Sequence, residues 1–365
     1  MNDAVRRLAE RLVSTPSHDD ETAAGDLIEQ WLTAETDADV QRDGAGNVIA
    51  RRSPGGGPTD ESLALVGHHD VVPPADEQLD TDGEYIIEER DGRLYGRGTA
   101  DMKGPLAAAL VAFRDADPHV DLIFASFVGE EQGGIGAQAA IEEGFSPTWG
   151  VVTEGSTGYS APGVTDVAVA HTGRRGSTIE ATGTAGHASR PAAAENAIYR
   201  ASDAIGIVRS LDAPETTVLG TELSGSLAVT VIEGGASWNV IPDHCSVTVD
   251  ERTVPGERAG LERVTEIEGV EWTVDQDLPP MACDDPAFAD RVLRAAAEAQ
   301  SGEPLQVAKP HATDAGWLAQ AGTACVVCGA AEPGEAHTAT ESVSLDVVDR
   351  CYEVYLAVAN SIRST

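Results

Sequence analysis

Side chains able to bind a metal ion follow a short apolar segment early in the chain. Residues 63–66 are Leu-Ala-Leu-Val and predict a buried strand, Gly67 is expected to end it, and His68, His69 and Asp70 come next. In extended backbone, His68 and Asp70 point to one side and His69 to the other. A neutral histidine ligates metal, and a carboxylate on its second nitrogen fixes its tautomer. The segment therefore indicates a metal ligand with a supporting carboxylate, although a turn with incidental polar residues would have the same composition.

Acidic side chains are predicted at the ends of further strands. Ligands in open α/β sheets lie outside the carboxyl ends of the strands, so we expect these side chains to meet at one edge. Two adjacent carboxylates, such as Glu130 and Glu131, cost energy unless a cation neutralises them or one takes up a proton. For Asp101, capping of the following helix is the ordinary alternative. Four strands would bring polar side chains to this edge of the sheet, the first of them being the strand before His68 and Asp70. The other three would present Asp101, where a strand gives way to a helix at 106–114, Glu130 and Glu131 after the strand 121–128, and Glu154 after the strand 149–153.

A last histidine completes the set. The apolar strand predicted at 323–328 leads into a loop that contains His337. A single loop histidine carries little weight, but this one supplies a nitrogen for a second metal position. Two histidines and three carboxylates suit a pair of zinc ions, with one carboxylate bridging them.

In order and spacing, these motifs resemble a family of di-zinc amidohydrolases and exopeptidases. The family includes acetylornithine deacetylase, succinyl-diaminopimelate desuccinylase, aminoacylase and glutamate carboxypeptidase, and the resemblance covers essentially the whole chain. It implies two Zn²⁺ ions, for which Co²⁺ or Mn²⁺ can substitute. The implied ligands are His68 and Glu154 for one ion and Glu131 and His337 for the other, with Asp101 as the bridge.

The same resemblance assigns roles to residues beside the ligands. Asp70 would orient His68, and Glu130 would be the general base that acts on water. The peptide bond between Asp101 and Met102 is expected to be cis. The chain departs from the family pattern at two positions: Gly129 stands where Asp is often seen, and Gly155 stands where Pro is common. Neither departure removes a ligand.

The middle of the chain has a different pattern from the two ends. Over residues 173–283, strands and helices alternate as in a small α+β domain with an antiparallel sheet, including a weak helix at 258–267. We therefore expect an α/β fold: a mixed-sheet catalytic domain like that of the zinc peptidases, in two parts (1–172 and 284–365), with this domain inserted. The resemblance makes the insertion a lid that forms the interface of a homodimer.

Within the insertion, three residues match positions that act on substrate in the resembling family. His187 would reach the neighbouring active site and stabilise the oxyanion. Asn239 and Arg252 would hold the carboxylate of the substrate. A loop histidine, a turn asparagine and a surface arginine are the alternative interpretations.

Composition limits where the protein works and what it binds. Asp and Glu number 61 and Lys and Arg 24, giving a formal net charge of −37, and Lys103 and Lys309 are the two lysines. Such evenly spread acidity is typical of halophilic proteins and disfavours nucleic acid and anionic membranes as partners. The sequence has neither a stretch of ~20 apolar residues nor a secretory signal, so we expect a cytoplasmic protein. The five cysteines, including Cys325 and Cys328 in an apolar stretch, are interpreted as core thiols.

The sequence predicts a metal-dependent hydrolase that cleaves the amide bond of N-acyl amino acids. A di- or tripeptide exopeptidase is the alternative, and residues 309–318 resemble the substrate-side loop of the family without showing a preference. A metal-binding protein without catalytic activity is a third interpretation, but it would not need Glu130. A two-metal phosphoesterase is disfavoured, since no cluster of basic residues for phosphate lies near the motifs.

Overall fold

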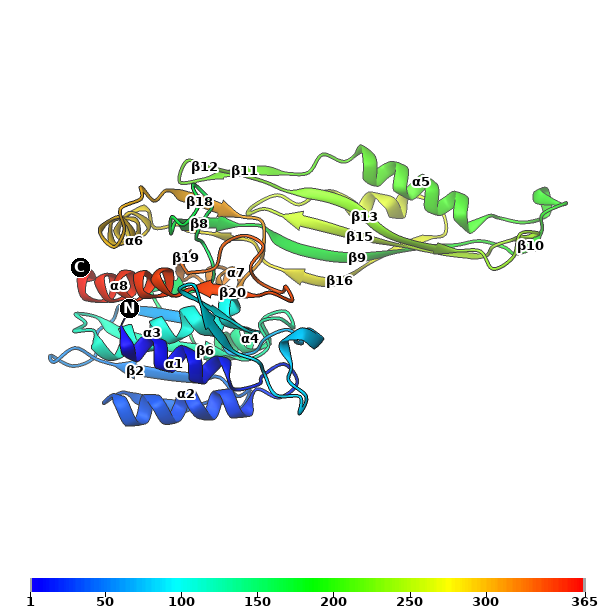
Figure 1. The fold of residues 1–365 in the computed structure, drawn as a ribbon. Helices are drawn as coiled ribbons and strands as arrows, with labels where there is room; N and C mark the ends of the chain where they lie inside the picture. The colour runs from blue at the N-terminus through cyan, green and yellow to red at the C-terminus, as the bar shows by residue number, and fades with distance from the viewer. Residues whose placement is uncertain (1, 364–365) are drawn as a thin grey trace. The chain divides into compact units, whose positions relative to one another are not determined.

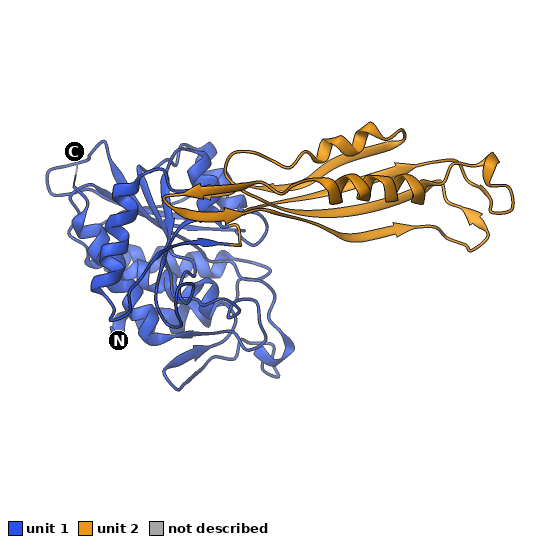
Figure 2. Cartoon of the chain, turned by 90° about the horizontal axis from the view of Figure 1, so that it is seen from above, with its two compact units in different colours: residues 1–170, 282–309, 313–365 blue, residues 171–281, 310–312 orange. Residues whose placement is uncertain are grey.

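The computed structural model describes residues 2–363, which form two compact units. Figure 2 shows them in different colours. The first unit comprises the chain up to Ala170, Ala282–Lys309 and the chain from Thr313, and the second comprises His171–Met281 and Pro310–Ala312. The second unit starts and ends two residues earlier than the predicted insertion 173–283, and it includes three residues from further along the chain.

A nine-stranded mixed sheet forms the centre of the first unit (Figure 1). Its inner strands β6, β3, β7 and β19 are parallel, and antiparallel strands flank them. The sheet confirms the predicted mixed α/β fold, and its parallel strands bring their carboxyl ends to one edge. The strand order is β1 (Asp39–Arg42), β2 (Val48–Arg52), β6 (Asp121–Phe127), β3 (Ser62–His68), β7 (Trp149–Val152), β19 (Ala324–Val327), β8 (Val167–His171) and β17 (Met281–Ala282), with β18 (Gln306–Lys309) paired to β8.

Strand β3 runs further than the sequence predicts. Gly67 does not end the strand, which continues through His68. A Cβ atom on Gly67 would lie 2.7 Å from Met102 Cε and 2.9 Å from Leu106 Cδ1. The absence of a side chain at Gly67 therefore lets Met102 and Leu106 pack closely against β3. The prediction of a turn at Gly67 is wrong.

Helices cover both faces of this sheet. α3 packs against α1 and α8, and α6 packs against α8, while α4 and α7 pack against each other. The crossovers β3–α3–β6 and β6–α4–β7 run in opposite directions across the sheet, so the right-handed rule places α3 and α4 on opposite faces. The helices are α1 (Asp3–Val13), α2 (Thr22–Glu35), α3 (Gly104–Asp115), α4 (Ile135–Glu142), α6 (Pro286–Glu298), α7 (Asp314–Gln320) and α8 (Leu345–Ser361).

The second unit is a four-stranded antiparallel sheet with one helix packed on it. Its order is β13 (Ser226–Gly234), β15 (His244–Thr253), β9 (Gly173–Thr182) and β16 (Val270–Leu278), and α5 (Ala197–Ser210) packs against it. Alternate strand residues such as Ile179, Val247 and Val249 are buried with the apolar side of α5. Two small pairs complete the unit: β10 (Gly186–His187) with β14 (Val240–Ile241), and β11 (Glu215–Val218) with β12 (Thr221–Ser224).

One predicted helix in this unit is wrong. Residues 258–267 form no α-helix, and the structure has a short 3₁₀ helix at Leu261–Glu266. Gly260 precedes this segment, and Val264, Thr265 and Ile267 are β-branched, so its intrinsic preference for α-helix is weak.

Three features of composition can be compared with the fold. All five cysteines are buried and free, which confirms their interpretation as core thiols. Both lysines are also buried, Lys103 at 0% and Lys309 at 5% exposure. Over residues 2–363, no helix is long and apolar enough to cross a membrane.

Candidate metal centre

Three parallel strands of the first unit bring candidate ligands to the same edge of the sheet. β3 ends at His68, with Asp70 beyond it, and Glu154 is the second residue after β7. After β6 the chain makes a tight turn that presents Glu130 and Glu131. In that turn the N–H groups of residues 133 and 134 donate to the Glu130 carbonyl oxygen at 2.8 and 3.0 Å. Glycines with φ of +60° (residue 129) and +76° (residue 134) make the turn possible.

Asp101 reaches the site by a different route. The strand before it, β5 (Arg93–Tyr95), belongs to a separate small sheet with β4 (Glu88–Arg90) and β20 (Ser342–Ser344). The prediction that a fourth strand of the main sheet delivers Asp101 is therefore wrong. Asp101 lies in an irregular turn just before α3, with φ −127° and ψ 93°, and its peptide bond to Met102 is cis, as the resemblance implied.

Asp101 lies between the two candidate histidine ligands, with one carboxylate oxygen facing each. Oδ1 is 3.1 Å from His68 Nε2, and Oδ2 is 3.1 Å from His337 Nε2. His337 Nε2 also lies 2.8 Å from Glu131 Oε1. This is the arrangement expected of a carboxylate that bridges two metal positions.

The side chains form two groups, each able to hold one ion. In each group one donor atom per residue lies within 4.8 Å of the others: His68, Glu130 and Glu154 in the first group, and Asp101, Glu131 and His337 in the second. Glu154 Oε1 is buried with no hydrogen-bond partner among residues 2–363, so this oxygen is available to bind a metal ion. Imidazole nitrogens with carboxylate oxygens suit Zn²⁺, Co²⁺ and Mn²⁺. The donor set thus fits a pair of divalent cations.

Asp70 supports the first histidine from behind. His68 Nδ1 is hydrogen-bonded to the Asp70 backbone carbonyl oxygen at 3.1 Å and lies 3.2 Å from Asp70 Oδ1. Asp70 Oδ2 accepts a hydrogen bond from the backbone N–H of Glu131 at 3.0 Å. His69 points away, with its Nδ1 2.9 Å from Ser126 Oγ, as strand alternation predicts. Asp70 therefore couples the His68 ring to the turn that carries Glu131 and favours the tautomer in which Nε2 is free to ligate.

The electrostatics of the site reflect crowded carboxylates. Burial, together with the charge of Glu154, raises the pKa of Glu130 well above its usual value. Burial also raises the pKa of Glu154 to about 7, although Lys309 opposes this shift. Hydrogen bonds to Asp101 and Glu131 raise the pKa of His337 to about 10. Groups in this arrangement favour either bound protons or bound cations, because like charges so close cannot all ionise unaided.

Three residues near the ligands have no individual role in the sequence prediction, although two of them lie within residues 309–318, the segment that resembles the substrate-side loop. Lys309 Nζ lies 3.5 Å from Glu154 Oε2. Asp314, the first residue of α7, is buried, and neither of its carboxylate oxygens has a hydrogen-bond partner among the described residues. The Glu341 side chain accepts hydrogen bonds from the backbone N–H groups of Ala100 and Asp101 at 3.0 and 3.2 Å. Sequence signals existed for two of them, since Lys309 is one of two lysines and Glu341 follows His337 by four residues.

The three predicted substrate residues of the second unit do not gather at one place. His187 is exposed on β10, its Nδ1 is 2.8 Å from Ser189 Oγ, and the N–H of Ala188 donates to the Asn239 carbonyl oxygen at 2.9 Å. His187 and Asn239 are therefore neighbours. Arg252 pairs with Asp250 at 2.9 Å near the other end of β15, roughly 25 Å away by strand length.

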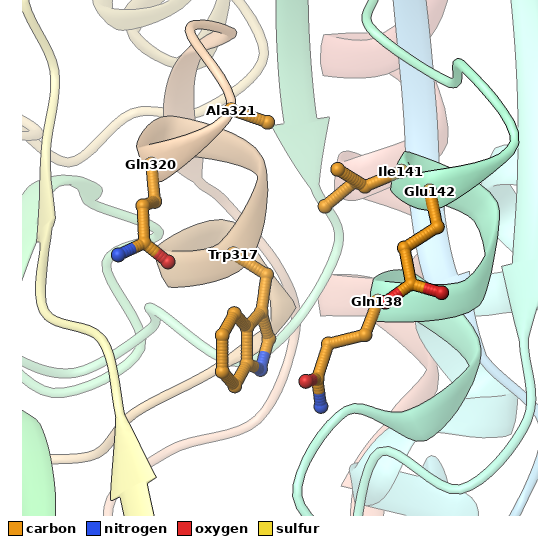
Figure 3. Close-up of a pocket in the computed structure, with 6 residues that line it drawn as sticks. All are labelled: Gln138, Ile141, Glu142, Trp317, Gln320 and Ala321. Carbon is orange, nitrogen blue, oxygen red and sulfur yellow. The ribbon is translucent and has the colours of Figure 1, made fainter.

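A groove on the first unit lies between α4 and α7, and none of the candidate ligands lines it. It measures about 260 Å³ and is lined by Gln138, Ile141, Glu142, Trp317, Gln320 and Ala321 (Figure 3). Trp317 Nε1 donates a hydrogen bond to the Gly133 carbonyl oxygen at 3.2 Å. α7 thus supports the turn that carries Glu130 and Glu131.

Known proteins are similar to this chain in sequence and in fold. Residues 64–361 match the peptidase family M20/M25/M40. An acetylornithine deacetylase from Myxococcus xanthus is 30% identical over 342 residues, covering 84% of this chain and 82% of that protein. A succinyl-diaminopimelate desuccinylase from Xylella fastidiosa is 28% identical over 316 residues, covering 80% of this chain and 81% of that protein.

Among solved structures, the aminopeptidase PepT from Bacillus cereus superposes with a TM-score of 0.79 at 20% identity, covering 98% of this chain and 97% of that one. A dinuclear metal-binding peptidase from Bacillus subtilis, YXEP, gives a TM-score of 0.67 at 16% identity, covering 97% and 96%. At 16–20% identity, this structural similarity shows a shared fold and does not by itself show a shared function. Taken with the family match, which spans most of the sequence, these findings establish that the chain belongs to the peptidase family M20/M25/M40.

Proposed function

We propose that this protein is a two-metal hydrolase that cleaves the amide bond of N-acyl amino acids. The observation that carries the proposal is the position of Asp101, with one oxygen 3.1 Å from His68 and the other 3.1 Å from His337. Relatives named acetylornithine deacetylase and succinyl-diaminopimelate desuccinylase support an acyl amino acid as substrate.

The residues of the site divide the work of hydrolysis. Two bound divalent cations, which we expect to be zinc, would lower the pKa of a water molecule and polarise the amide carbonyl. Glu130 takes the proton of the attacking water and returns it to the leaving amine nitrogen. Asp70 holds the His68 ring in its ligating tautomer.

The second unit would supply the substrate contacts. His187 donates a hydrogen bond to the carbonyl oxygen as negative charge develops there. Arg252 binds the substrate carboxylate by a charge-assisted hydrogen bond. Asn239, which lies beside His187 and roughly 25 Å from Arg252 by strand length, would assist from the partner chain together with His187. Because the active site would use His187 from a second chain, we expect the working protein to be a homodimer. We expect this dimer in the cytoplasm.

A substrate panel separates this function from its alternatives. N-acetyl amino acids, N-succinyl amino acids, dipeptides and tripeptides would be incubated with protein loaded with Zn²⁺ or Co²⁺, and released amine would be measured. We expect the highest kcat/KM with an N-acyl amino acid. The highest value with a peptide would replace deacylase by exopeptidase, and no turnover of any member would favour a metal-binding protein without catalysis.

Metal content is the first quantity to measure. We expect the folded protein, dialysed after addition of Zn²⁺ or Co²⁺, to retain two ions per chain. Each ion would have two ligands of its own, His68 with Glu154 or Glu131 with His337, and Asp101 would serve both. Elemental analysis with a protein concentration from amino-acid analysis gives the ratio. A ratio near zero after metal addition would contradict the metal centre, and a ratio of one would contradict the pair.

Stability should depend strongly on salt. The formal net charge is −37, and self-repulsion of this charge destabilises the compact state when screening is weak. Raising ionic strength from 0.01 M to 1 M shortens the Debye length from ~30 Å to ~3 Å. We expect the melting temperature to rise steeply over this range, measured by circular dichroism in NaCl. A flat profile would contradict the halophilic interpretation.

A further inference from the structure

Glu341 makes contacts that are unusual for a carboxylate outside a set of ligands. Its side chain is buried, with the residue 1% exposed. Arg97 Nη1 donates to Oε2 at 2.5 Å, and the backbone N–H groups of Ala100 and Asp101 donate to Oε1 at 3.0 and 3.2 Å. Burial of a charged carboxylate is costly, and these three donors are what offsets it. Two of the three contacts hold the backbone at the candidate bridging ligand.

The backbone of Glu341 is tied to the same place. Its carbonyl oxygen accepts the N–H of Gly96 at 3.1 Å, and the next residues form β20, which pairs with β5 through Ser342 and Tyr95. The segment of residues 337–341 therefore lies against the segment of residues 95–101 through both backbone and side-chain bonds.

The same segment carries His337, one of the ligands of the second group. Glu341 N–H donates to the Thr338 carbonyl oxygen at 3.3 Å, which closes the short loop between His337 and Glu341. His337 itself has a φ of +60° and is half exposed, so packing around its side chain does little to fix it. Its ring contacts Asp101 and Glu131, and its backbone belongs to the loop that Glu341 attaches to the Asp101 backbone.

We infer that Glu341 is a positioning residue that fixes the distance between Asp101 and His337, and thereby the affinity of the second metal position. The inference rests on the metal pair of the proposed function. Glu341 contacts neither substrate nor ion: it holds the backbone of one ligand while belonging to the loop of another. Removing a residue that orients metal ligands typically weakens binding 10- to 100-fold.

Three variants distinguish the loss of the two backbone hydrogen bonds from the loss of the buried charge. In the double variant R97L/E341L an apolar pair replaces the ion pair, a change that is often tolerated in a protein interior. In E341D the carboxylate is retained but is one methylene too short to keep both backbone N–H bonds. In R97Q/E341Q the amide oxygen introduced at position 341 can still accept both backbone bonds, and its NH2 group faces the amide introduced at position 97 in place of a guanidinium, so this variant should retain metal binding.

The second unit offers a matched control. Arg175 Nε donates to Glu251 Oε2 at 2.5 Å, Glu251 Oε1 accepts the N–H of Ala259 at 3.2 Å, and Glu251 is 1% exposed. The double variant R175L/E251L removes an ion pair of the same chemistry and burial, with no candidate metal ligand on the backbone that it holds. Any effect of losing a buried ion pair as such will appear in this control.

The measurement is Co²⁺ binding to the full-length metal-free protein, by calorimetric titration with melting curves for each variant. We expect the Kd of the second ion to rise about 10- to 100-fold in E341D and R97L/E341L, with the first ion little changed. R97Q/E341Q and R175L/E251L should bind both ions as the unsubstituted protein does. If R97L/E341L does not fold, E341D alone decides.

Two results would overturn the inference. One is a second Kd in E341D within about threefold of the unsubstituted value, well below the expected range. The other is an equal loss in R175L/E251L, which would show that lost stability and not lost spacing is responsible. An unsubstituted protein that binds fewer than two Co²⁺ ions would instead contradict the proposed metal pair.

Discussion

Replacing Glu130 with glutamine is expected to lower kcat by about 10²- to 10⁴-fold while both metal ions stay bound. Glutamine has nearly the shape of glutamate but cannot accept and return a proton. Glu130 is one of the side chains of the first group, which also contains His68 and Glu154. Geometry alone is thus compatible with Glu130 as a base or as a ligand, and the substitution decides between the two.

The matched control is Glu131→Gln on the neighbouring residue. Glu131 contacts His337 at 2.8 Å, so its loss should release the second ion and lower turnover as a consequence. Metal content and kcat would be measured together on both variants at saturating substrate. If Glu130→Gln loses an ion while Glu131→Gln keeps both ions and loses turnover, the two roles have been exchanged.

Activity should reappear when two inactive variants, His187→Ala and Glu130→Ala, are mixed. If His187 acts on the active site of a partner chain, a mixed C₂ dimer contains one site with both defects and one with neither. At equal amounts and random exchange, half of the dimers are mixed and each has one intact site. The mixture should then regain about a quarter of the unsubstituted activity.

The position of His187 makes this experiment practical. The histidine is exposed on a short two-stranded segment, and its ring contacts only Ser189 among the hydrogen bonds of the described chain. Alanine there should leave the fold intact. Each variant alone should be inactive, and subunit exchange would be followed with a tag on one chain. A mixture that exchanges but stays inactive would contradict a role for His187 in trans.

The strands that carry the site are predicted correctly where their sequence pattern is local. Apolar runs followed by polar residues predicted β3, β6 and β7, and the period of two predicted that Asp70 and His69 face opposite sides. Those signals are present in a few consecutive residues. The prediction that Asp101 ends a strand of the main sheet failed because the apolar signal before it belongs to a separate small sheet.

Long-range contacts account for what the sequence could not predict. Glu341 binds the backbone of a residue 240 positions away, and no local pattern encodes such a pairing. The sequence predicts a turn at Gly67 because the neighbouring residues do not distinguish a glycine inside a strand from a glycine at its end. Only the neighbouring Met102 and Leu106 reveal that close packing requires it.

The burial of both lysines has a consequence for how the protein can be handled and modified. With Lys103 and Lys309 inside, the folded chain presents no accessible lysine amine over residues 2–363. Acylating enzymes, reducing sugars and amine-reactive crosslinkers therefore find no lysine target at the surface of the native state. Side-chain carboxylates, which number 61 in the sequence, are the abundant reactive groups, so carbodiimide activation with an added dihydrazide linker is suited to trapping its assemblies, and the same activation attaches it to a support that bears amines.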